Sequence, residues 1–128
     1  MPLYTLASRK PLSAAVRKEV ADLVTDAHCQ VTGAPAQFVN VVFMHGHDLR
    51  DGNLVGVIGN VRSGGNRSDD VLKRLRERLQ ADVAAKANVA VDKVSVRLIG
   101  VPSRWVMEGG EIMPEPGAEA AWLERAKA

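Results

Sequence analysis

Residues 11–35 read PLSAAVRKEVADLVTDAHCQVTGAP, and this stretch has the features of one long amphipathic helix. Ser13 has a side chain that commonly caps a helix N-terminus, and apolar residues then recur at helical spacing. These apolar residues are Val16, Val20, Leu23, Val24, Ala27 and Val31. Gly33 stands where a C-cap glycine belongs and Pro35 cannot continue a helix, so the sequence predicts that the helix ends there.

Strand-like segments lie on both sides of this helix, and the same order then occurs a second time. Residues 3–7 and 38–44 flank the first helix, and residues 54–61 and 94–101 have the same strand character. Between the latter two, a glycine-rich loop is followed by Ser68 and two acidic residues, which is typical of a helix start. The apolar stripe of this second helix is Leu72, Leu75, Leu79 and Val83. The two halves therefore align with an offset of about 55 residues.

A strand, a long helix and a second strand imply a parallel strand pair with a crossover helix. Two such units predict an α/β protein (α+β in some schemes) with a four-stranded, mostly parallel sheet and both helices on one face. We expect one domain over residues 1–128, with repeat one at 2–44, repeat two at 54–101 and a C-terminal arm at 102–128. The arm contains two tryptophans, a Gly-Gly turn of hairpin type and a short helix rich in Ala and Glu.

One face of this sheet would carry no helix. Its residues follow from strand alternation, because successive side chains point to opposite faces. The residues expected to face the helices are Val39, Val41, Phe43, Val94, Val96 and Leu98. Those expected on the other face are Asn40, Val42, Ser95 and Arg97. So much mixed surface is unfavourable in water for a small domain, so we predict oligomerisation through it, with the arm packing on a neighbour.

Composition limits the class of protein, its location and its ligands. With 46% apolar and 25% charged residues, 128 residues can bury a core without metals or cross-links. No apolar stretch approaches the ~18 residues of a membrane span, and no leader peptide is evident, so we expect a cytoplasmic protein. The single cysteine, Cys29, fits a reducing compartment. A net charge of +2 spread along the chain does not favour nucleic acid, but it suits small anionic substrates.

Several segments resemble one known family. Pro2 directly follows Met1, the βαβ unit is doubled, and the segments PLYTL, TDAH at 25–28 and VMEGGEIMPEPG at 106–117 are similar to those of the tautomerase superfamily. Within it the chain most resembles the cis-3-chloroacrylic acid dehalogenase group, over residues 2 to about 122. The resemblance implies a cofactor-free, metal-free homotrimer whose N-terminal prolines lie in clefts between subunits.

The resemblance also implies a set of site residues. Pro2 would be catalytic, Glu108 in the arm would activate water or polarise the substrate, and His28 would bind the carboxylate or the reacting oxygen. Arg62 and Arg67 would bind the substrate carboxylate. Three features depart from the family pattern: four residues instead of two separate these arginines, the arm is shorter, and Arg97 replaces a tyrosine.

Each of these residues also has a purely structural interpretation. The two arginines could lie in a solvated loop, His28 could be a boundary histidine bonded to a carbonyl, and Glu111 competes with Glu108. Arg97 could act in the site, by binding a second carboxylate or by lowering the pKa of Pro2. An inter-subunit salt bridge is an equal alternative for this residue.

A histidine pair offers the one sign of a metal site. His45 and His47 share a strand end, but a metal site usually needs a third ligand, so we interpret them as loop residues.

The chemistry of Pro2 depends on removal of Met1, which frees a secondary amine. Burial and guanidinium groups lower the pKa of such an amine and make it a base, whereas a carboxylate raises the pKa and keeps it an acid. The sequence therefore predicts a tautomerase acting on small 2-oxo or unsaturated carboxylic acids, with possible hydratase activity. The alternatives are a cis-3-chloroacrylic acid dehalogenase and a non-catalytic trimer that binds small acids.

Overall fold

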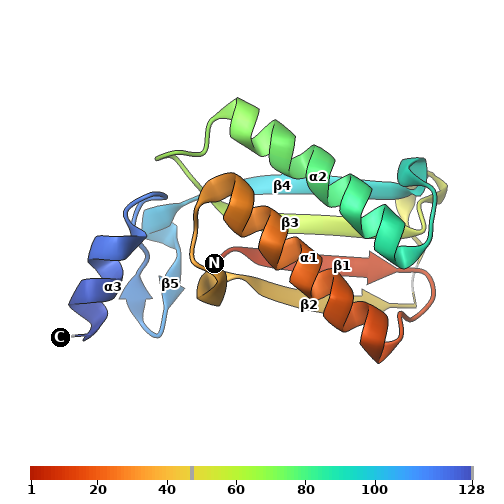
Figure 1. The fold of residues 1–128 in the computed structure, drawn as a ribbon, viewed down its shortest axis with the longest axis horizontal. Helices are drawn as coiled ribbons and strands as arrows, with labels where there is room; N and C mark the ends of the chain where they lie inside the picture. Colours follow the sequence, from red (N-terminus) through yellow and green to blue (C-terminus); the bar gives the residue numbers. More distant parts are fainter. Residues whose placement is uncertain (47, 128) are drawn as a thin grey trace.

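The computed structural model describes residues 1–46 and 48–127, and its elements follow the predicted order (Figure 1). The first repeat contains β1 (Leu3–Ser8), α1 (Ala14–Thr32) and β2 (Asn40–His45). The second contains β3 (Val55–Ser63), α2 (Asp69–Ala87) and β4 (Val94–Pro102). The arm contains β5 (Met107–Glu108), β6 (Glu111–Ile112) and α3 (Glu119–Lys127). None of the described helices is long and apolar enough to span a bilayer.

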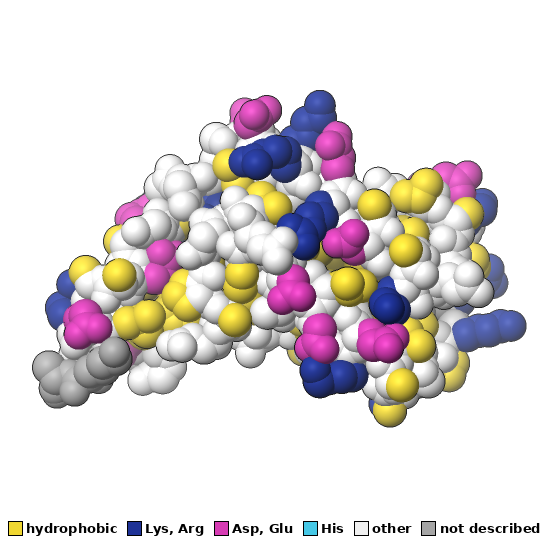
Figure 2. Space-filling model, viewed as in Figure 1, with side chains coloured by type: hydrophobic (Ala, Val, Ile, Leu, Met, Phe, Trp, Pro, Cys, Tyr) yellow, Lys and Arg dark blue, Asp and Glu magenta, His cyan; other side chains and the backbone are white. Residues whose placement is uncertain are grey.

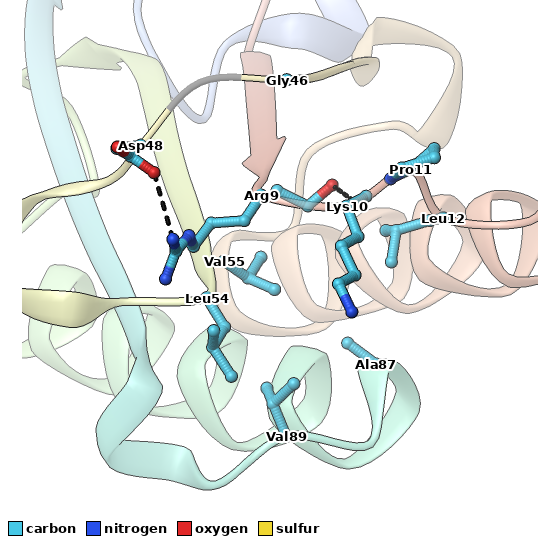
Figure 3. Close-up of a pocket in the computed structure, with 11 residues that line it drawn as sticks. Arg9, Lys10, Pro11, Leu12, Gly46, Asp48, Leu54, Val55, Ala87 and Val89 are labelled. Atoms are coloured by element: carbon cyan, nitrogen blue, oxygen red, sulfur yellow. Dashed lines mark hydrogen bonds and ion pairs between the residues drawn. The ribbon is translucent and has the colours of Figure 1, made fainter.

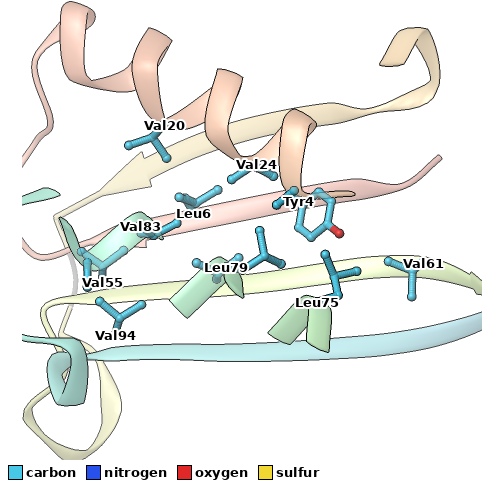
Figure 4. Close-up of a cluster of buried hydrophobic side chains, with 13 residues drawn as sticks. Tyr4, Leu6, Val20, Val24, Val55, Val61, Leu75, Leu79, Val83 and Val94 are labelled. Carbon is cyan, nitrogen blue, oxygen red and sulfur yellow. The ribbon is translucent and has the colours of Figure 1, made fainter. Parts of the chain in front are cut away.

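The four long strands form one mixed sheet in the order β2-β1-β3-β4. Each repeat contributes one parallel pair, β1 with β2 and β3 with β4, and the two pairs meet in the antiparallel contact of β1 with β3. Both long helices lie on the same face of this sheet (Figures 1 and 4). The predicted sheet, mostly parallel with two helices on one face, is confirmed.

The two repeats match each other closely. Ser13 and Ser68 both cap their helices by accepting a backbone N–H at 3.2 Å, and both helices end on a left-handed residue, Gly33 and Asn88. The helix bounds differ by 55 residues at both ends. In the antiparallel contact Tyr4 pairs with Gly59, which is its own equivalent at this offset. The approximate two-fold axis relating the repeats therefore passes through this residue pair.

The core lies between the helices and the sheet, and both repeats supply it (Figure 4). Leu6, Val24, Val57 and Leu79 are among its fully buried members. Of the positions on α1, the sequence pattern placed His28 at the edge of the apolar stripe. In the structure His28 lies within the buried face, with 1% of its surface exposed.

The two faces of the molecule differ in character. The helix-bearing face carries many Lys, Arg, Asp and Glu side chains (Figure 2), including the ion pair of Lys18 with Asp22 on α1. The opposite face of the sheet exposes apolar side chains: Leu3, Val42, Met44, Ile58 and Ile99. Asn40, Ser95 and Arg97 are also exposed there, so the expected assignment of residues to the two faces is observed.

The arm packs against its own chain. Its hairpin turns at Gly109 and Gly110, whose φ angles of 60° and 83° are those of a type I′ turn. The inner side forms a small core of Phe38, Val106, Met113 and Trp122, with the Phe38 and Trp122 rings 5.8 Å apart. The outer side leaves Trp105, Met107 and Ile112 exposed. We expected the arm to pack on a neighbouring subunit, and within one chain only this outer side is available for such a contact.

Gly59→Ala is expected to lower the free energy of unfolding by about 1–3 kcal/mol, the usual cost of overpacking a core. A Cβ at Gly59 would lie 2.6 Å from the Tyr4 ring and 2.9 Å from Leu98. Gly56→Ala in the same strand is the control, because a Cβ there meets nothing closer than 3.4 Å. Urea denaturation of the two variants measures the difference, and equal stabilities would contradict the proposed clash.

Candidate active site

The candidate site lies at the end of the sheet where β1 and β2 begin and β3 and β4 end. The last turn of α1 and the loop before α2 meet there, and the arm adjoins it (Figure 1). Pro2 is buried at this end, and its carbonyl accepts a hydrogen bond from the backbone N–H of Asn40 at 3.0 Å. Strand alternation places Pro2 on the same face of β1 as Tyr4, toward the helices.

Tyr4 and His28 form a buried polar pair in the site. The Tyr4 hydroxyl lies 2.7 Å from His28 Nδ1, and the two rings meet edge to face with centroids 5.7 Å apart. Burial raises the pKa of Tyr4, so its hydroxyl remains protonated and donates to Nδ1. The proton of a neutral imidazole then resides on Nε2. His28 Nε2 is buried and has no hydrogen-bond partner among the described residues.

His28 is neutral at physiological pH. Burial is the main cause that lowers its pKa to about 3, and the positive charges of Arg67, Arg62 and the N-terminal amine lower it further. These three electrostatic effects also show that the groups lie near His28. The ring is therefore a neutral hydrogen-bond donor with positive charges nearby.

Arg67 is the second buried donor with unused capacity. Its NH1 donates to the carbonyl of Thr32 at 3.4 Å and to the side-chain oxygen of Asn66. Thr32 ends α1, where the helix dipole favours a cation. Arg67 Nε is buried without a partner among the residues that the structure describes. A buried donor without a partner costs about 1–3 kcal/mol, which an oxygen ligand would recover.

Arg62 has a different environment. Its NH2 donates to Glu119 Oε1 at 2.7 Å and its NH1 donates to the carbonyl of Pro114, while the guanidinium lies 5.8 Å from the Phe38 ring centre. Both Arg62 and Glu119 are almost fully buried. Glu119 therefore neutralises Arg62 and ties the arm to β3. The sequence predicted a substrate-binding role for both arginines, but only Arg67 retains a free buried donor.

The side chain of Glu108 contacts the N-terminal residue of the chain. Its carboxylate is ion-paired with the Met1 amine, one residue from the Pro2 nitrogen. Glu111, the competing residue, pairs opposite Glu108 in the β5–β6 hairpin and is exposed. Of the two glutamates, the structure gives Glu108 the contact with the chain start.

Arg97 is not brought to this site within one chain. It lies opposite Ile58 in the β3–β4 pair, exposed on the helix-free face. His45 ends β2 at the other end of the sheet, and His47 lies outside the described residues. Among the described residues there is no group of three or more His, Cys, Asp or Glu side chains that could hold a metal ion.

Two residues of the site were missed by sequence reasoning. Tyr4 carried a signal, because it is two residues from Pro2 and therefore shares its strand face. Glu119 carried none, since 57 residues separate it from Arg62. The unusual spacing of Arg62 and Arg67 was an indirect sign that Arg62 has another partner.

No model of a known protein family matches the chain, and no curated protein sequence matches it. Several solved structures do. N1, described as a member of the cis-3-chloroacrylic acid dehalogenase (cis-CaaD) family, superposes with a TM-score of 0.86 at 28% identity, over 96% of this chain and 91% of N1.

Two further structures are similar to the chain. Pt0534 inactivated by 2-oxo-3-pentynoate gives a TM-score of 0.73 at 26% identity, over 88% of this chain and 96% of the other. A fused 4-OT, described as an asymmetric trimer, gives 0.77 at 20% identity, over 87% and 95%.

The doubled βαβ fold, with the N-terminus near the buried side chains of His28 and Arg67, is the fold of the tautomerase superfamily, which the chain resembles over nearly its whole length. Within that superfamily of enzymes it resembles the cis-3-chloroacrylic acid dehalogenase group, to which N1 is assigned.

Acidification is expected to destabilise the protein through His28. Its pKa is about 3 in the folded chain and 6.5 in the unfolded chain, so the unfolded state binds the extra proton between these values. The stability is complete above pH 6.5 and is lost progressively as the pH falls toward 3. From pH 7 to about 4.5 the loss through this residue should be about 2–3 kcal/mol.

Urea unfolding at a series of pH values measures this loss. His28→Gln should show a smaller fall in stability on acidification than the unaltered protein, and His45→Gln, an exposed control, should not. If His28→Gln weakens folding too much, an NMR titration of the His28 ring serves instead. A ring that protonates near pH 6.5 would contradict the prediction.

Proposed function

We propose that the protein is a cofactor-free tautomerase that uses the amine of Pro2, after loss of Met1, to move protons on small 2-oxo or unsaturated carboxylic acids. One observation carries this proposal: among the described residues, His28 Nε2 and Arg67 Nε are buried donors without partners, and His28 lies near both Arg67 and the N-terminal amine. Two such donors suit the oxygens of a carboxylate or an enolate.

The proton transfer follows from these groups. A neutral Pro2 amine takes the enol proton of a substrate held by Arg67 and His28, and the resulting ammonium returns a proton to the carbon that becomes tetrahedral. One proton is taken and one is returned, so the amine is regenerated. His28 and Arg67 stabilise the negative charge that develops on oxygen between the two steps.

The surroundings of Pro2 influence its amine in opposite directions. After loss of Met1, burial and the Arg67 guanidinium would favour the neutral amine, whereas the Glu108 carboxylate, which contacts the Met1 amine, would favour the charged amine. Arg62 contributes less, because Glu119 neutralises it. Tautomerisation uses the amine as a base, and Glu108 then orients the substrate through a hydrogen bond.

The position of Glu108 also supports a second candidate, hydrolytic dehalogenation of cis-3-chloroacrylate. A Pro2 kept protonated by Glu108 would donate a proton to carbon while the carboxylate activates water. The similarity to N1 supports the same candidate. Release of chloride from cis-3-chloroacrylate, faster than ketonisation of an enol, would favour it. A non-catalytic trimer that binds small acids is the third possibility, and loss of all turnover would favour it.

We also propose that the protein assembles as a homotrimer through the helix-free face of the sheet. That face exposes several large apolar side chains of β1 to β4, and the related fused 4-OT is described as a trimer. Arg97 lies on the same face, so it could act on a substrate only across a subunit interface. The trimer is expected to be cytoplasmic, with a small anionic acid as its ligand.

The sharpest test of the proline mechanism changes the amine without changing the proline. Insertion of a glutamate between Met1 and Pro2 leaves the initiator methionine in place and keeps the Pro2 nitrogen acylated. Ketonisation of phenylenolpyruvate should then fall by about 10²–10⁴-fold, the usual contribution of a positioned acid or base. Pro2→Ala should cause a loss as well, because a primary amine has a different basicity and shape.

Mass spectrometry of the unaltered protein is the matching control, since the mechanism requires loss of Met1. An insertion variant as active as the unaltered protein would refute the role of the amine. A purified protein that turns over enols while retaining Met1 would refute it equally.

Arg67→Gln is expected to raise KM for a 2-oxo acid by about 10–100-fold, since it removes a charged donor to the carboxylate. Lys86→Gln provides the control, because Lys86 pairs with Glu19 on the exposed surface at the other end of the two helices, away from the site. Steady-state kinetics of the two variants give the comparison. An unchanged KM in Arg67→Gln would show that the carboxylate binds elsewhere.

A further inference from the structure

A large groove lies at the opposite end of the sheet from Pro2 (Figure 3). Its volume is about 860 Å³, within the range of 300–1,000 Å³ that is usual for small-molecule sites. Four segments form its walls (Figure 3). They are the loop from Ser8 to Leu12 after β1, Gly46 and Asp48 after β2, Leu54 and Val55 at the start of β3, and Ala87 and Val89 at the end of α2.

The internal repeat relates this groove to the candidate active site. At the offset of 55 residues, the loop from Ser8 to Leu12 occupies the position of residues 63–67, which end in Arg67. Ala87 and Val89 occupy the positions of Thr32 and Ala34 at the end of α1. The groove is therefore the counterpart, in the second repeat, of the candidate active site.

The counterpart lacks the groups that move protons. At the same offset Pro2 corresponds to Val57, within a strand and without a free amine, and His28 corresponds to Val83, which is buried in the core. Tyr4 corresponds to Gly59. No proton transfer of the kind proposed for Pro2 can therefore take place in the groove.

The groove nevertheless contains two cations. Arg9 and Lys10 lie in the loop between β1 and α1, where the first site has glycines. Arg9 NH2 lies 3.2 Å from Asp48 Oδ1, but both side chains are largely exposed, and exposed pairs of this kind contribute little. The Lys10 amine has no ion-pair partner among the described residues, and its side chain extends along Leu12 toward Ala87 (Figure 3).

The remaining walls are apolar. Leu12, Leu54, Val55, Ala87 and Val89 lie beneath the two cations in the same groove (Figure 3). A ligand that fits both parts has one anionic head and an apolar body.

We propose that this groove is a second, non-catalytic binding site for a small organic carboxylate with an apolar substituent. Lys10 and Arg9 bind the carboxylate, and Leu54, Ala87 and Val89 contact the apolar body. The proposal rests on the groove and the repeat, so it holds whether or not Pro2 is catalytic. Combined with the proposed function, it would give each chain two classes of carboxylate site, only one of which turns substrate over.

Methyl NMR of the full-length protein tests the proposal, with 3-phenylpropionate as the probe. Addition of the probe is expected to shift the methyl signals of Leu12, Leu54 and Val89 with saturation. The double variant Arg9→Gln and Lys10→Gln should weaken this binding by at least ~10-fold. Lys18→Gln is the control, because Lys18 pairs with Asp22 on the exposed side of α1 and should leave the affinity unchanged.

Several results would overturn the proposal. Shifts confined to Val24, Val61 and other residues around the first site would show that the groove does not bind the probe. An unchanged affinity in the double variant would exclude the two cations as the carboxylate site. Equal shifts with inorganic phosphate would indicate a general attraction of anions and not a site for organic acids. Loss of Pro2-dependent turnover alone would not affect the result, because the groove lies at the other end of the sheet.

Discussion

The hydrogen bond between the Tyr4 hydroxyl and His28 Nδ1 is the interaction on which the site depends. It joins the central strand of the sheet to the last turn of α1, and it selects the tautomer in which His28 Nε2 can donate to a ligand. The pair exists because Gly59 leaves the space that the Tyr4 ring occupies. The glycine at the two-fold axis thus allows a buried Tyr4–His28 pair in the first repeat that has no counterpart in the second.

The two repeats share one scaffold, but only the first carries the residues of the candidate site. Helix caps, helix bounds and strand pairing agree between the halves, so the scaffold is shared. Among the differences, Val57, Gly59 and Val83 of the second half stand in place of Pro2, Tyr4 and His28 of the first. Burying a tyrosine and a histidine costs free energy, and this cost arises only at the end of the sheet that holds the candidate site.

Much of the architecture could be predicted from sequence because it is encoded locally. Ser13, Gly33 and Ser68 mark helix ends by their own backbone and side-chain chemistry, and strand alternation assigned the two faces of the sheet correctly. The pairing of Arg62 with Glu119 is set by tertiary packing, which no local pattern reports. Arg97 shows the same limit, since its face was predictable but the residues that meet it belong to another subunit in the proposed trimer.

The ion pair of Arg62 with Glu119 determines how the arm can behave. Moving α3 away would take Glu119 with it and leave the buried Arg62 guanidinium against Phe38 without its carboxylate partner, a change that typically costs about 3–5 kcal/mol. The arm is therefore held in place, unlike the hinged flaps that close over many enzyme active sites. In the proposed enzyme, access of substrate to Pro2 would therefore not depend on movement of the arm.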